Sequence, residues 1–185
     1  MTGCNRSGRR PNPPIMTTGV PAVFLDRDGV LIEDSGYPHL EEHLRFTPGA
    51  AEAVRRLNAL GYLCVIVTNQ SGVARGLFSE DQMKAFNTLI VRRLAAKGAV
   101  IGAVYACPFH AEAREERYRH PDHPDRKPNP GMILRAIKEH RIDPAKSFLI
   151  GDQPSDLEAA RRAGIPGFRF EGGNLDHFVK DLFGH

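Results

Sequence analysis

The chain has 185 residues, 41% hydrophobic and 25% charged, which is the balance of an ordinary globular domain with a real core. Its formal charge of +3 equals the contribution of Arg6, Arg9 and Arg10, so the remainder is balanced and offers no broad basic surface for nucleic acid. No run approaches the roughly 18 apolar residues of a membrane span, and no apolar export segment follows the N-terminal arginines. We therefore expect neither a nucleic-acid nor a membrane partner.

Residues 1–20 mix Gly, Pro, Asn, Ser, Thr and Arg with almost nothing to bury, so we expect a disordered N-terminal extension in which Met16 is an alternative start. Residues 21–185 contain no repeat and no long linker, which indicates a single domain. The chain has three cysteines, too few for an even disulfide framework: Cys4, Cys64 and Cys107. That usage is typical of a reducing compartment, so we expect a cytoplasmic protein.

The first predicted element is a strand at 22–25, where Ala-Val-Phe-Leu runs without a polar break. Such a run is typical of a strand buried on both faces of a parallel sheet. After it we expect helices at 50–60, 80–97, 130–140, 157–163 and 175–183, strands at 63–67, 100–107, 147–150 and 167–170, and a long ordered loop at 108–128. The alternation predicts an α/β fold: a doubly wound, Rossmann-like parallel sheet with helices on both faces and only small loop caps.

Polar residues follow three of the predicted strands at the point where each strand ends. Asp26 and Asp28 follow the first strand, the run 68–72 (Thr-Asn-Gln-Ser-Gly) follows the second, and Asp152 follows the fourth. Any one of these ends is more often a turn than a site, because Asp, Asn, Ser and Gly are common turn residues. Since the carboxyl ends of parallel strands share one edge of the sheet, the three together indicate one functional site.

The residue types at this edge suit phosphoryl transfer. Asp26, Asp28 and Asp152 supply carboxylate oxygens of the kind that octahedral Mg²⁺ prefers. Phosphate oxygens need hydroxyl, amide and cationic donors, and these are available from Thr68, Asn69, Arg126 and Lys127. A cation, a carboxylate nucleophile, amide donors and a lysine are together the parts of a phosphoryl-transfer site.

In this order the motifs resemble the four motifs of the haloacid dehalogenase superfamily of phosphatases: Asp26-Arg27-Asp28-Gly29-Val30, Thr68, Lys127, and Gly151-Asp152 with Asp156 behind. Longer strings look more narrowly like the heptose-bisphosphate and histidinol phosphatases: Phe24 to Val30, Gly36-Tyr37, Thr68 to Gly76, and Arg126-Lys127-Pro128. The resemblance covers residues 22–170, and four ordered motifs over that span are highly specific.

This resemblance implies a role for each motif residue. Asp26 would attack phosphorus and become an aspartyl phosphate, while Asp28 would protonate the leaving oxygen and then take a proton from water. Magnesium would sit on Asp26, Asp28 through its backbone carbonyl, and Asp152, and the phosphoryl oxygens would be held by Thr68 and Lys127. The implied substrate contacts are Asp34, Ser35, Gly36, Tyr37, Thr68, Asn69, Gln70, Ser71, Arg126, Lys127 and Gln153.

The loop after the third strand departs from the family pattern. Many relatives hold a structural zinc there with a Cys-x-His pair and a Cys-x-Cys pair before Arg-Lys-Pro, but here only Cys107 remains, with Phe109, His123 and Asp125 at the other three positions. A mixed zinc site could still form from four residues: Cys107, His110, His120 and His123. Cys107 and His110 would form one ligand pair, and His120 and His123 the other. The irregular gap between these two pairs favours a metal-free loop whose histidines are solvated.

We therefore expect a Mg²⁺-dependent phosphatase of a small phosphorylated sugar, a monomer with a pocket shaped by loops. The leading substrate is the 7-phosphate of D-glycero-D-manno-heptose 1,7-bisphosphate, followed by histidinol phosphate and then by another sugar phosphate. A reading from another class is a receiver-type signalling domain that accepts a phosphoryl group on Asp26. The carboxylate of Asp28 argues against a receiver, because an acid/base group at this position gives fast dephosphorylation.

Overall fold

The computed structural model describes residues 19–184, so the expectations for residues 1–18, including Cys4 and Met16, lie outside the described range. At the end of the expected extension, Val20 pairs with the body of the molecule. Its N–H donates to the carbonyl of Arg141 at 3.1 Å, and its carbonyl accepts from the N–H of Asp143 at 2.9 Å. In this part of the chain no helix is both long and apolar enough to cross a membrane.

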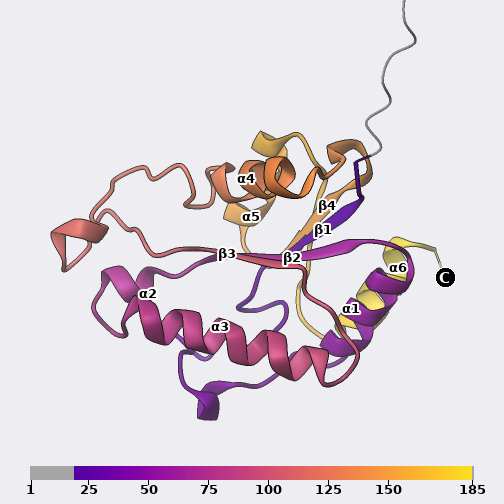
Figure 1. Ribbon diagram of the computed structural model, residues 1–185, viewed down its shortest axis with the longest axis horizontal. Coiled ribbons are helices and arrows are strands. Elements are labelled where there is room, and N and C mark those ends of the chain that lie inside the picture. The colour runs from indigo at the N-terminus through magenta and orange to yellow at the C-terminus, as the bar shows by residue number, and fades with distance from the viewer. Residues whose placement is uncertain (1–18, 185) are drawn as a thin grey trace, which may run out of the picture.

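A single sheet of five parallel strands forms the centre of the molecule, in the order β3-β2-β1-β4-β5 (Figure 1). The central strand is β1 (Ala22–Leu25), flanked by β2 (Leu63–Asn69) and β4 (Phe148–Gly151). The edges are β3 (Ala103–Cys107) and β5 (Gly167–Arg169). The strand order reverses between β1 and β4, and such a switch point opens a crevice for ligands at the carboxyl ends of the strands.

The apolar run of β1 explains its central position, because all four of its side chains are fully buried. Leu25 lies opposite Ile66 of β2 and Ile150 of β4. The next residue, Asp26, donates its N–H to the carbonyl of Ile150 at 3.0 Å and is then the first polar side chain beyond the core. The strand therefore delivers Asp26 to the crevice from the middle of the sheet.

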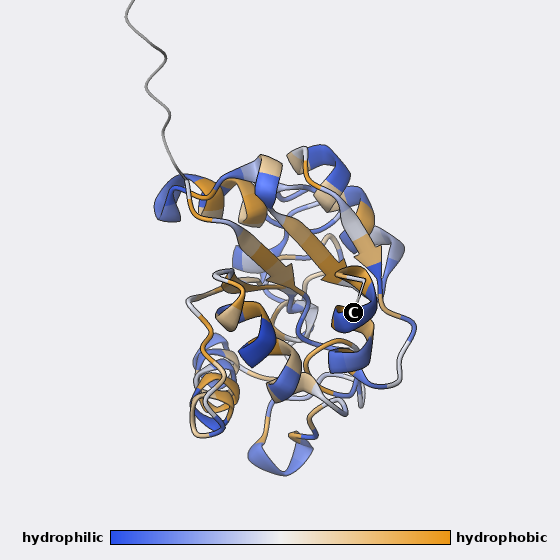
Figure 2. Ribbon diagram, turned by 90° about the vertical axis from the view of Figure 1, so that its right-hand side faces the viewer, coloured by the Kyte–Doolittle hydropathy of each residue, from blue (hydrophilic) through white to orange (hydrophobic). Residues whose placement is uncertain are grey.

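Helices cover both faces of the sheet, as the alternation of elements predicts (Figure 1). One face packs against α1 (Ala50–Ala59), α3 (Glu80–Ala95) and α6 (Leu175–Leu182), and the other against α4 (Gly131–His140) and α5 (Pro154–Ala163). Figure 2 shows hydrophobic strands enclosed between helices that carry hydrophilic stretches. Each fully buried Leu, Ile or Phe in these two cores stabilises the fold by about 2 kcal/mol relative to its exposed state.

The connections contain short helical segments that the periodicity does not predict. They are α2 (Ser71–Ala74) and three 3₁₀ turns, Glu41–His43, Glu116–Tyr118 and Pro144–Lys146. The long loop expected at 108–128 is ordered because its side chains pack in a small core on α2 and the start of α3. Tyr118 is buried in that core, and its hydroxyl donates to Glu80 at 3.2 Å.

Two element boundaries differ by three residues from those expected, and the others differ by two residues or fewer. The third strand begins at Ala103 and not at residue 100, because Val100 instead donates its N–H to the side chain of Asn58 at 2.8 Å. Helix α5 begins at Pro154, three residues before the expected start, because proline suits the first turn of a helix.

From the sequence we also expect Asn129 to cap the helix at 130–140, because asparagine is a common N-cap residue, but this expectation is wrong: Pro130 occupies the cap position of α4. The Asn129 amide donates instead to the carbonyl of His123 at 3.0 Å, and its oxygen accepts from Arg162 at 2.8 Å. Asn129 therefore ties the end of the long loop to α5.

Candidate active site

The crevice at the switch point is a pocket of about 390 Å³. Five aspartates and one lysine are among its lining residues, so the pocket is acidic. An acidic pocket repels a phosphate dianion unless a cation offsets the charge. The lining residues are Asp26, Asp28, Asp34, Gly36, Tyr37, Asn69, Gln70, Ser71, Lys127, Asp152, Gln153, Ser155 and Asp156.

Lys127 is the cationic centre of the pocket floor and is 4% exposed. Its Nζ lies 2.9 Å from Asp26 Oδ1 and 2.6 Å from Asp156 Oδ1, and it donates to the carbonyl of Val67 at 2.9 Å. Burial alone would lower the pKa of Lys127, but the two carboxylates outweigh burial and raise it. The lysine is therefore charged, and its three N–H donors each face an oxygen.

Burial raises the pKa of Asp26 to about 7, although Lys127 opposes this shift. The nearby charges of Asp156 and Asp28 act in the same direction as burial. A nucleophilic carboxylate must be ionised, and a divalent cation bound beside it would lower its pKa. A divalent cation in the pocket would therefore favour the ionised form of Asp26.

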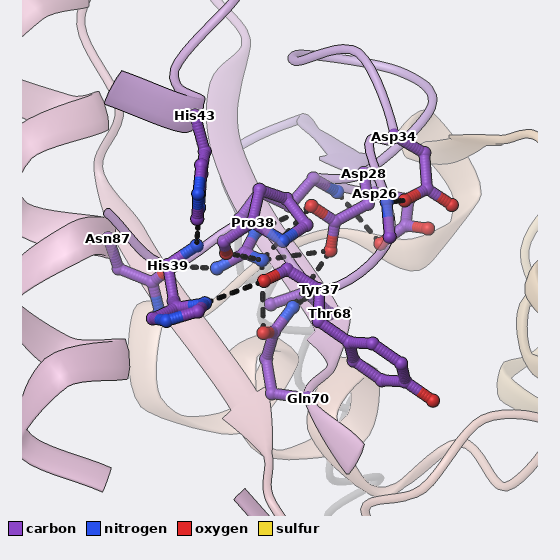
Figure 3. Close-up of polar contacts among 12 residues, drawn as sticks. Asp26, Asp28, Asp34, Tyr37, Pro38, His39, His43, Thr68, Gln70 and Asn87 are labelled. Atoms are coloured by element: carbon purple, nitrogen blue, oxygen red, sulfur yellow. Dashed lines mark hydrogen bonds and ion pairs between the residues drawn. The ribbon is translucent and has the colours of Figure 1, made fainter. Parts of the chain in front are cut away.

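Asp28 faces a different set of groups. Its carboxylate accepts from Arg27 Nε at 3.1 Å, from Arg27 Nη2 at 3.0 Å and from Gln70 Nε2 at 2.8 Å (Figure 3). Burial raises the pKa of Asp28 while the Arg27 charge and these hydrogen bonds oppose the shift. A raised pKa keeps a carboxyl group protonated nearer to neutral pH, which suits a proton donor.

One group of described residues could hold a metal ion. The carboxylates of Asp26, Asp152 and Asp156 each offer an oxygen, and these oxygens all lie within 4.8 Å of one another. Asp156 is already engaged by Lys127 and by the N–H of Gln153 at 3.0 Å. Asp152 Oδ1, in contrast, is a buried oxygen that has neither a hydrogen-bond partner nor an ion pair among the described residues. An all-oxygen donor set with one orphaned carboxylate oxygen fits a hard cation such as Mg²⁺.

Two glycines make room for these carboxylates. A Cβ on Gly29 would lie 2.6 Å from Asp152 Oδ2, and Gly29 also has a φ of +81°. A Cβ on Gly151 would lie 2.3 Å from the Cβ of Asp156. Any side chain at either position would displace a carboxylate, which explains in physical terms why each acidic motif includes a glycine.

The structure brings most of the expected site residues to this pocket. Three of them, Ser35, Thr68 and Arg126, are not among the residues that line it. Thr68 is 1% exposed, and its hydroxyl accepts from Gln70 Nε2 at 2.9 Å. Arg126 is half-buried, and its Nη1 donates to the carbonyl of Phe109 at 3.2 Å.

The side-chain amides of Asn69 and Gln70, at the end of β2, are held by neighbouring protein groups. Asn69 accepts from the N–H of Lys127 and donates to its carbonyl, both at 3.0 Å, so it ties the lysine's backbone to β2. Gln70 donates to Asp28 and Thr68 and accepts from Arg27 at 3.0 Å. These side chains therefore hold the catalytic candidates in place.

The loop at 34–39 lines the pocket through Asp34, Gly36 and Tyr37, and Asp34 and Tyr37 are labelled with Asp28 in Figure 3. The N–H of Gly36 donates to Asp34 Oδ1 at 2.9 Å and closes a tight turn. Tyr37 has a φ of 57°, a left-handed conformation that non-glycine residues seldom adopt. His39 supports it, because its Nδ1 lies 2.8 Å from the Tyr37 carbonyl and its ring stacks on Phe78 at 4.6 Å.

The four candidate zinc ligands do not form a group of converging ligand atoms within the described residues. Cys107 Sγ lies 3.9 Å from His123 Nδ1, but that nitrogen also accepts from the N–H of Asp125 at 3.1 Å. Phe109 stacks on the His123 ring with centroids 4.0 Å apart. The nitrogens of His110 and His120 accept from backbone N–H groups two residues ahead.

Two functional residues were missed or undervalued by the sequence analysis. Arg27 received no role, although it is 1% exposed and bonded to Asp28. Nothing in a single sequence separates a buried arginine in a turn from a solvated one. Asp156 appeared only as a motif residue, although it pairs with Lys127. Its capping contact with the N–H of Gln153 has a local signature, an acidic residue at the third helical position.

Comparison with known proteins agrees with this geometry. Residues 125–177 match a family model described as HAD-hydrolase-like. A D-glycero-beta-D-manno-heptose-1,7-bisphosphate 7-phosphatase from Rhodopseudomonas palustris is 52% identical over 163 residues, which cover 88% of this chain and 89% of that protein. A protein of the same name from Pasteurella multocida is 47% identical over 144 residues, which cover 78% of this chain and 77% of that protein.

A solved structure is also similar. The D,D-heptose 1,7-bisphosphate phosphatase from B. bronchiseptica, complexed with magnesium and phosphate, aligns with a TM-score of 0.71 and 31% identity. The alignment covers 89% of this chain and 87% of that chain. That protein therefore has this fold and binds magnesium and phosphate, the two ions that a phosphoryl-transfer pocket is suited to bind.

Proposed function

Because this chain belongs to the haloacid-dehalogenase-like hydrolases, in the family of the D-glycero-D-manno-heptose-1,7-bisphosphate 7-phosphatases, we propose that it removes the 7-phosphate of that heptose bisphosphate. The observation that carries the proposal is the convergence of Asp26, Asp28 and Lys127 in one pocket at the carboxyl end of the central strand. The names of the relatives from Rhodopseudomonas palustris and Pasteurella multocida support the β anomer as the substrate.

In the first step, Asp26 attacks the phosphorus of the 7-phosphate. Asp26 Oδ1 is engaged by Lys127 Nζ at 2.9 Å and by the N–H of Arg27 at 2.7 Å, so we assign the attack to Oδ2. The bond from Oδ2 to phosphorus forms while the bond from phosphorus to the sugar oxygen breaks. A carboxylate can do this at neutral pH without a separate base.

Asp28 transfers the protons. Its carboxyl proton goes to the departing sugar oxygen, so that the product leaves as an alcohol and not as an alkoxide. A water molecule then attacks the phosphorus of the aspartyl phosphate and gives one proton to the Asp28 carboxylate. Asp26 is released as a carboxylate, and inorganic phosphate leaves, so both residues return to their starting states.

We assign the Mg²⁺ site to Asp26, Asp152 and the backbone carbonyl of Asp28. When bound, Mg²⁺ supplies positive charge that ionises Asp26 and offsets the charge of the phosphoryl group. Lys127 holds Asp26 through Oδ1, and Asp156 keeps that lysine in place. Thr68 retains its proposed contact with a phosphoryl oxygen, because its hydroxyl accepts from Gln70 and can still donate its own proton.

The test of the substrate is a comparison of kcat/KM over a panel of phosphate esters with Mg²⁺. The panel contains both anomers of the heptose 1,7-bisphosphate, histidinol phosphate and fructose 1,6-bisphosphate. We expect the β-heptose bisphosphate to lead the panel by about 10-fold or more, the discrimination that a few well-placed polar contacts supply. A lead for histidinol phosphate, or weak turnover of every ester alike, would contradict the assignment.

We further propose that the protein acts as a cytoplasmic monomer. The thiols of Cys64 and Cys107 are unpaired and buried, which suits a reducing compartment. Size-exclusion chromatography with light scattering tests the monomer, and an active dimer that dissociates into inactive chains would overturn it.

A further inference from the structure

Among residues 19–184, Arg27 is the largest side chain that is almost fully buried, with 1% exposed. A buried guanidinium is costly unless charged or polar partners surround it. Its neighbours in the chain are the two motif aspartates, yet the phosphatase mechanism above assigns no step to the Arg27 side chain. The contacts of the Arg27 side chain therefore indicate its role in the site.

The guanidinium donates two hydrogen bonds to the Asp28 carboxylate, and we call this bidentate pairing the fork. Nε donates to Oδ1 at 3.1 Å and Nη2 donates to Oδ2 at 3.0 Å, so the arginine holds both oxygens. Gln70 adds a third bond, from Nε2 to Asp28 Oδ2 at 2.8 Å. Bidentate pairing fixes the direction of a carboxylate as well as its position, which a point charge cannot do.

The remaining donors of Arg27 connect Asp28 to the loop and to helix α3. Nη2 also donates to the carbonyl of Pro38 at 3.1 Å, next to Tyr37 in the loop that lines the pocket. Nη1 donates to Asn87 Oδ1 at 2.8 Å, and the guanidinium lies 5.2 Å from the ring of Phe86. Asn87, Gln70 and Pro38, which each accept a hydrogen bond from the guanidinium, are labelled in Figure 3. One buried side chain thus links a proton carrier, the pocket loop and a core helix.

We propose that Arg27 is a positioning residue for leaving-group protonation: it holds the Asp28 carboxyl group in the direction of the departing oxygen, and Asn87 in turn holds Arg27. This inference rests on the proposed function, in which Asp28 is the proton donor. Because a small displacement of a catalytic group costs up to about 100-fold in rate, the fork is a sufficient reason to bury an arginine here.

The test uses leaving groups that differ in their need for a proton. A sugar alcohol must be protonated as it leaves, whereas p-nitrophenolate leaves without a proton. The rate of leaving-group release is measured in the first turnover at saturating substrate. Later turnovers are not used, because hydrolysis of the aspartyl phosphate also needs Asp28. The substrates are the heptose bisphosphate and p-nitrophenyl phosphate, each with Mg²⁺.

Arg27→Lys keeps the charge and removes the fork. We expect release of the sugar to slow by about 10-fold or more and release of p-nitrophenolate to change by less than about 3-fold. Asn87→Ala loosens the arginine without touching Asp28, and we expect a smaller loss with the same selectivity. This second variant also decides the question if Arg27→Lys does not fold.

The matched control is Arg56→Lys. Arg56 grips Asp176 through Nε at 2.8 Å and Nη2 at 3.3 Å, far from the pocket, and we expect both release rates to stay at parental values. A general loss of structure would slow both substrates in the Arg27 and Asn87 variants equally, and that result would overturn the proposal. Equal parental rates for both substrates would overturn it as well.

The Asp28→Asn variant distinguishes a failure of the positioning proposal from a failure of the proton-donor role of Asp28. If it slows sugar release selectively while the Arg27 and Asn87 variants do not, only the positioning proposal fails. If Asp28→Asn shows no selectivity, the role of Asp28 as proton donor fails and the positioning proposal fails with it.

Discussion

The ion triad of Asp26, Lys127 and Asp156 concentrates opposite charges in the pocket floor, with all three side chains largely buried. Removing one partner of a buried ion pair leaves the others uncompensated. We expect Lys127→Met to lower the free energy of unfolding by about 3 kcal/mol, measured by urea denaturation at neutral pH. Asp156→Asn in the same chain should restore part of this loss, because it removes one of the stranded carboxylates.

Lys84→Met is the control for that experiment. Lys84 pairs with Glu80 at 2.8 Å on the exposed face of α3, so its removal should leave the unfolding midpoint unchanged. Equal effects of the Lys127 and Lys84 substitutions would contradict the central place of the triad in the fold.

The raised pKa of Asp26 makes Mg²⁺ binding dependent on pH. Since burial raises this pKa to about 7, the group holds a proton below that pH when no cation is bound. Mg²⁺ must displace this proton, so its apparent affinity should fall by about 10-fold for each pH unit below the pKa of Asp26. Titration calorimetry at about pH 8 and at about pH 6 measures the difference, and the same affinity at both values would show that Asp26 is not a ligand.

Between elements, an ion network joins the first helix to the last. Asp176 at the start of α6 accepts from Arg56 of α1 at 2.8 Å and pairs with Lys180 at 2.8 Å. The hydrogen bond from Arg56 is the main reason that the pKa of Asp176 falls to about 2. This carboxylate therefore stabilises the fold above the pKa of an unfolded aspartate, near 4, and the contribution is lost as the pH falls from about 4 to about 2.

We expect Asp176→Asn to be less stable than the parent by about 1 kcal/mol at neutral pH, the value of a partly exposed charge network. The difference between the two proteins should shrink as the pH falls and vanish near the pKa of Asp176. Urea denaturation of both proteins across this range tests it. A constant difference at every pH would mean that packing, and not charge, joins these helices.

The loop between β3 and α4 is held by side-chain packing. Phe109 stacks on His123, Asp125 pairs with Arg135 at 2.7 Å, and Tyr118 is buried against α2. We expect purified protein to contain less than about 0.1 zinc per chain, since a structural zinc site has four converging ligands. EDTA should leave the Tm unchanged under the same conditions. Elemental analysis that finds zinc near one per chain would contradict the prediction of a metal-free loop.

At the scale of the whole molecule, local patterns predicted the architecture well because the strands are short, apolar and bounded by turn residues. The run 22–25 became the central strand, and the polar ends of β1, β2 and β4 met in one pocket. The clustering of Asp26 with Asp152 required only the rule that parallel strands share a carboxyl edge. Periodicity and topology were therefore sufficient for the fold and for the acidic half of the site.

The rest of the site depends on contacts between distant residues, which a single sequence does not contain. The bonds of Asn69 to the Lys127 backbone join residues 58 positions apart. The bond of Arg27 to Asn87 joins residues 60 positions apart. The sequence predicted a substrate contact at Gln70. It did not indicate that the Gln70 amide is engaged by Asp28, Thr68 and Arg27. The donors that remain available to a substrate can be identified only when the neighbouring residues in the folded chain are known.

The central claim is that Asp26 carries the phosphoryl group between substrate and water. The direct measurement is borohydride reduction of the enzyme during turnover, followed by peptide mass spectrometry, because an acyl phosphate is reduced to an alcohol. The Asp28→Asn variant with p-nitrophenyl phosphate is the best material, since its intermediate forms without an acid and is slow to hydrolyse. We expect homoserine at position 26. A burst of p-nitrophenolate without homoserine at position 26, or with homoserine at another aspartate, would contradict the account.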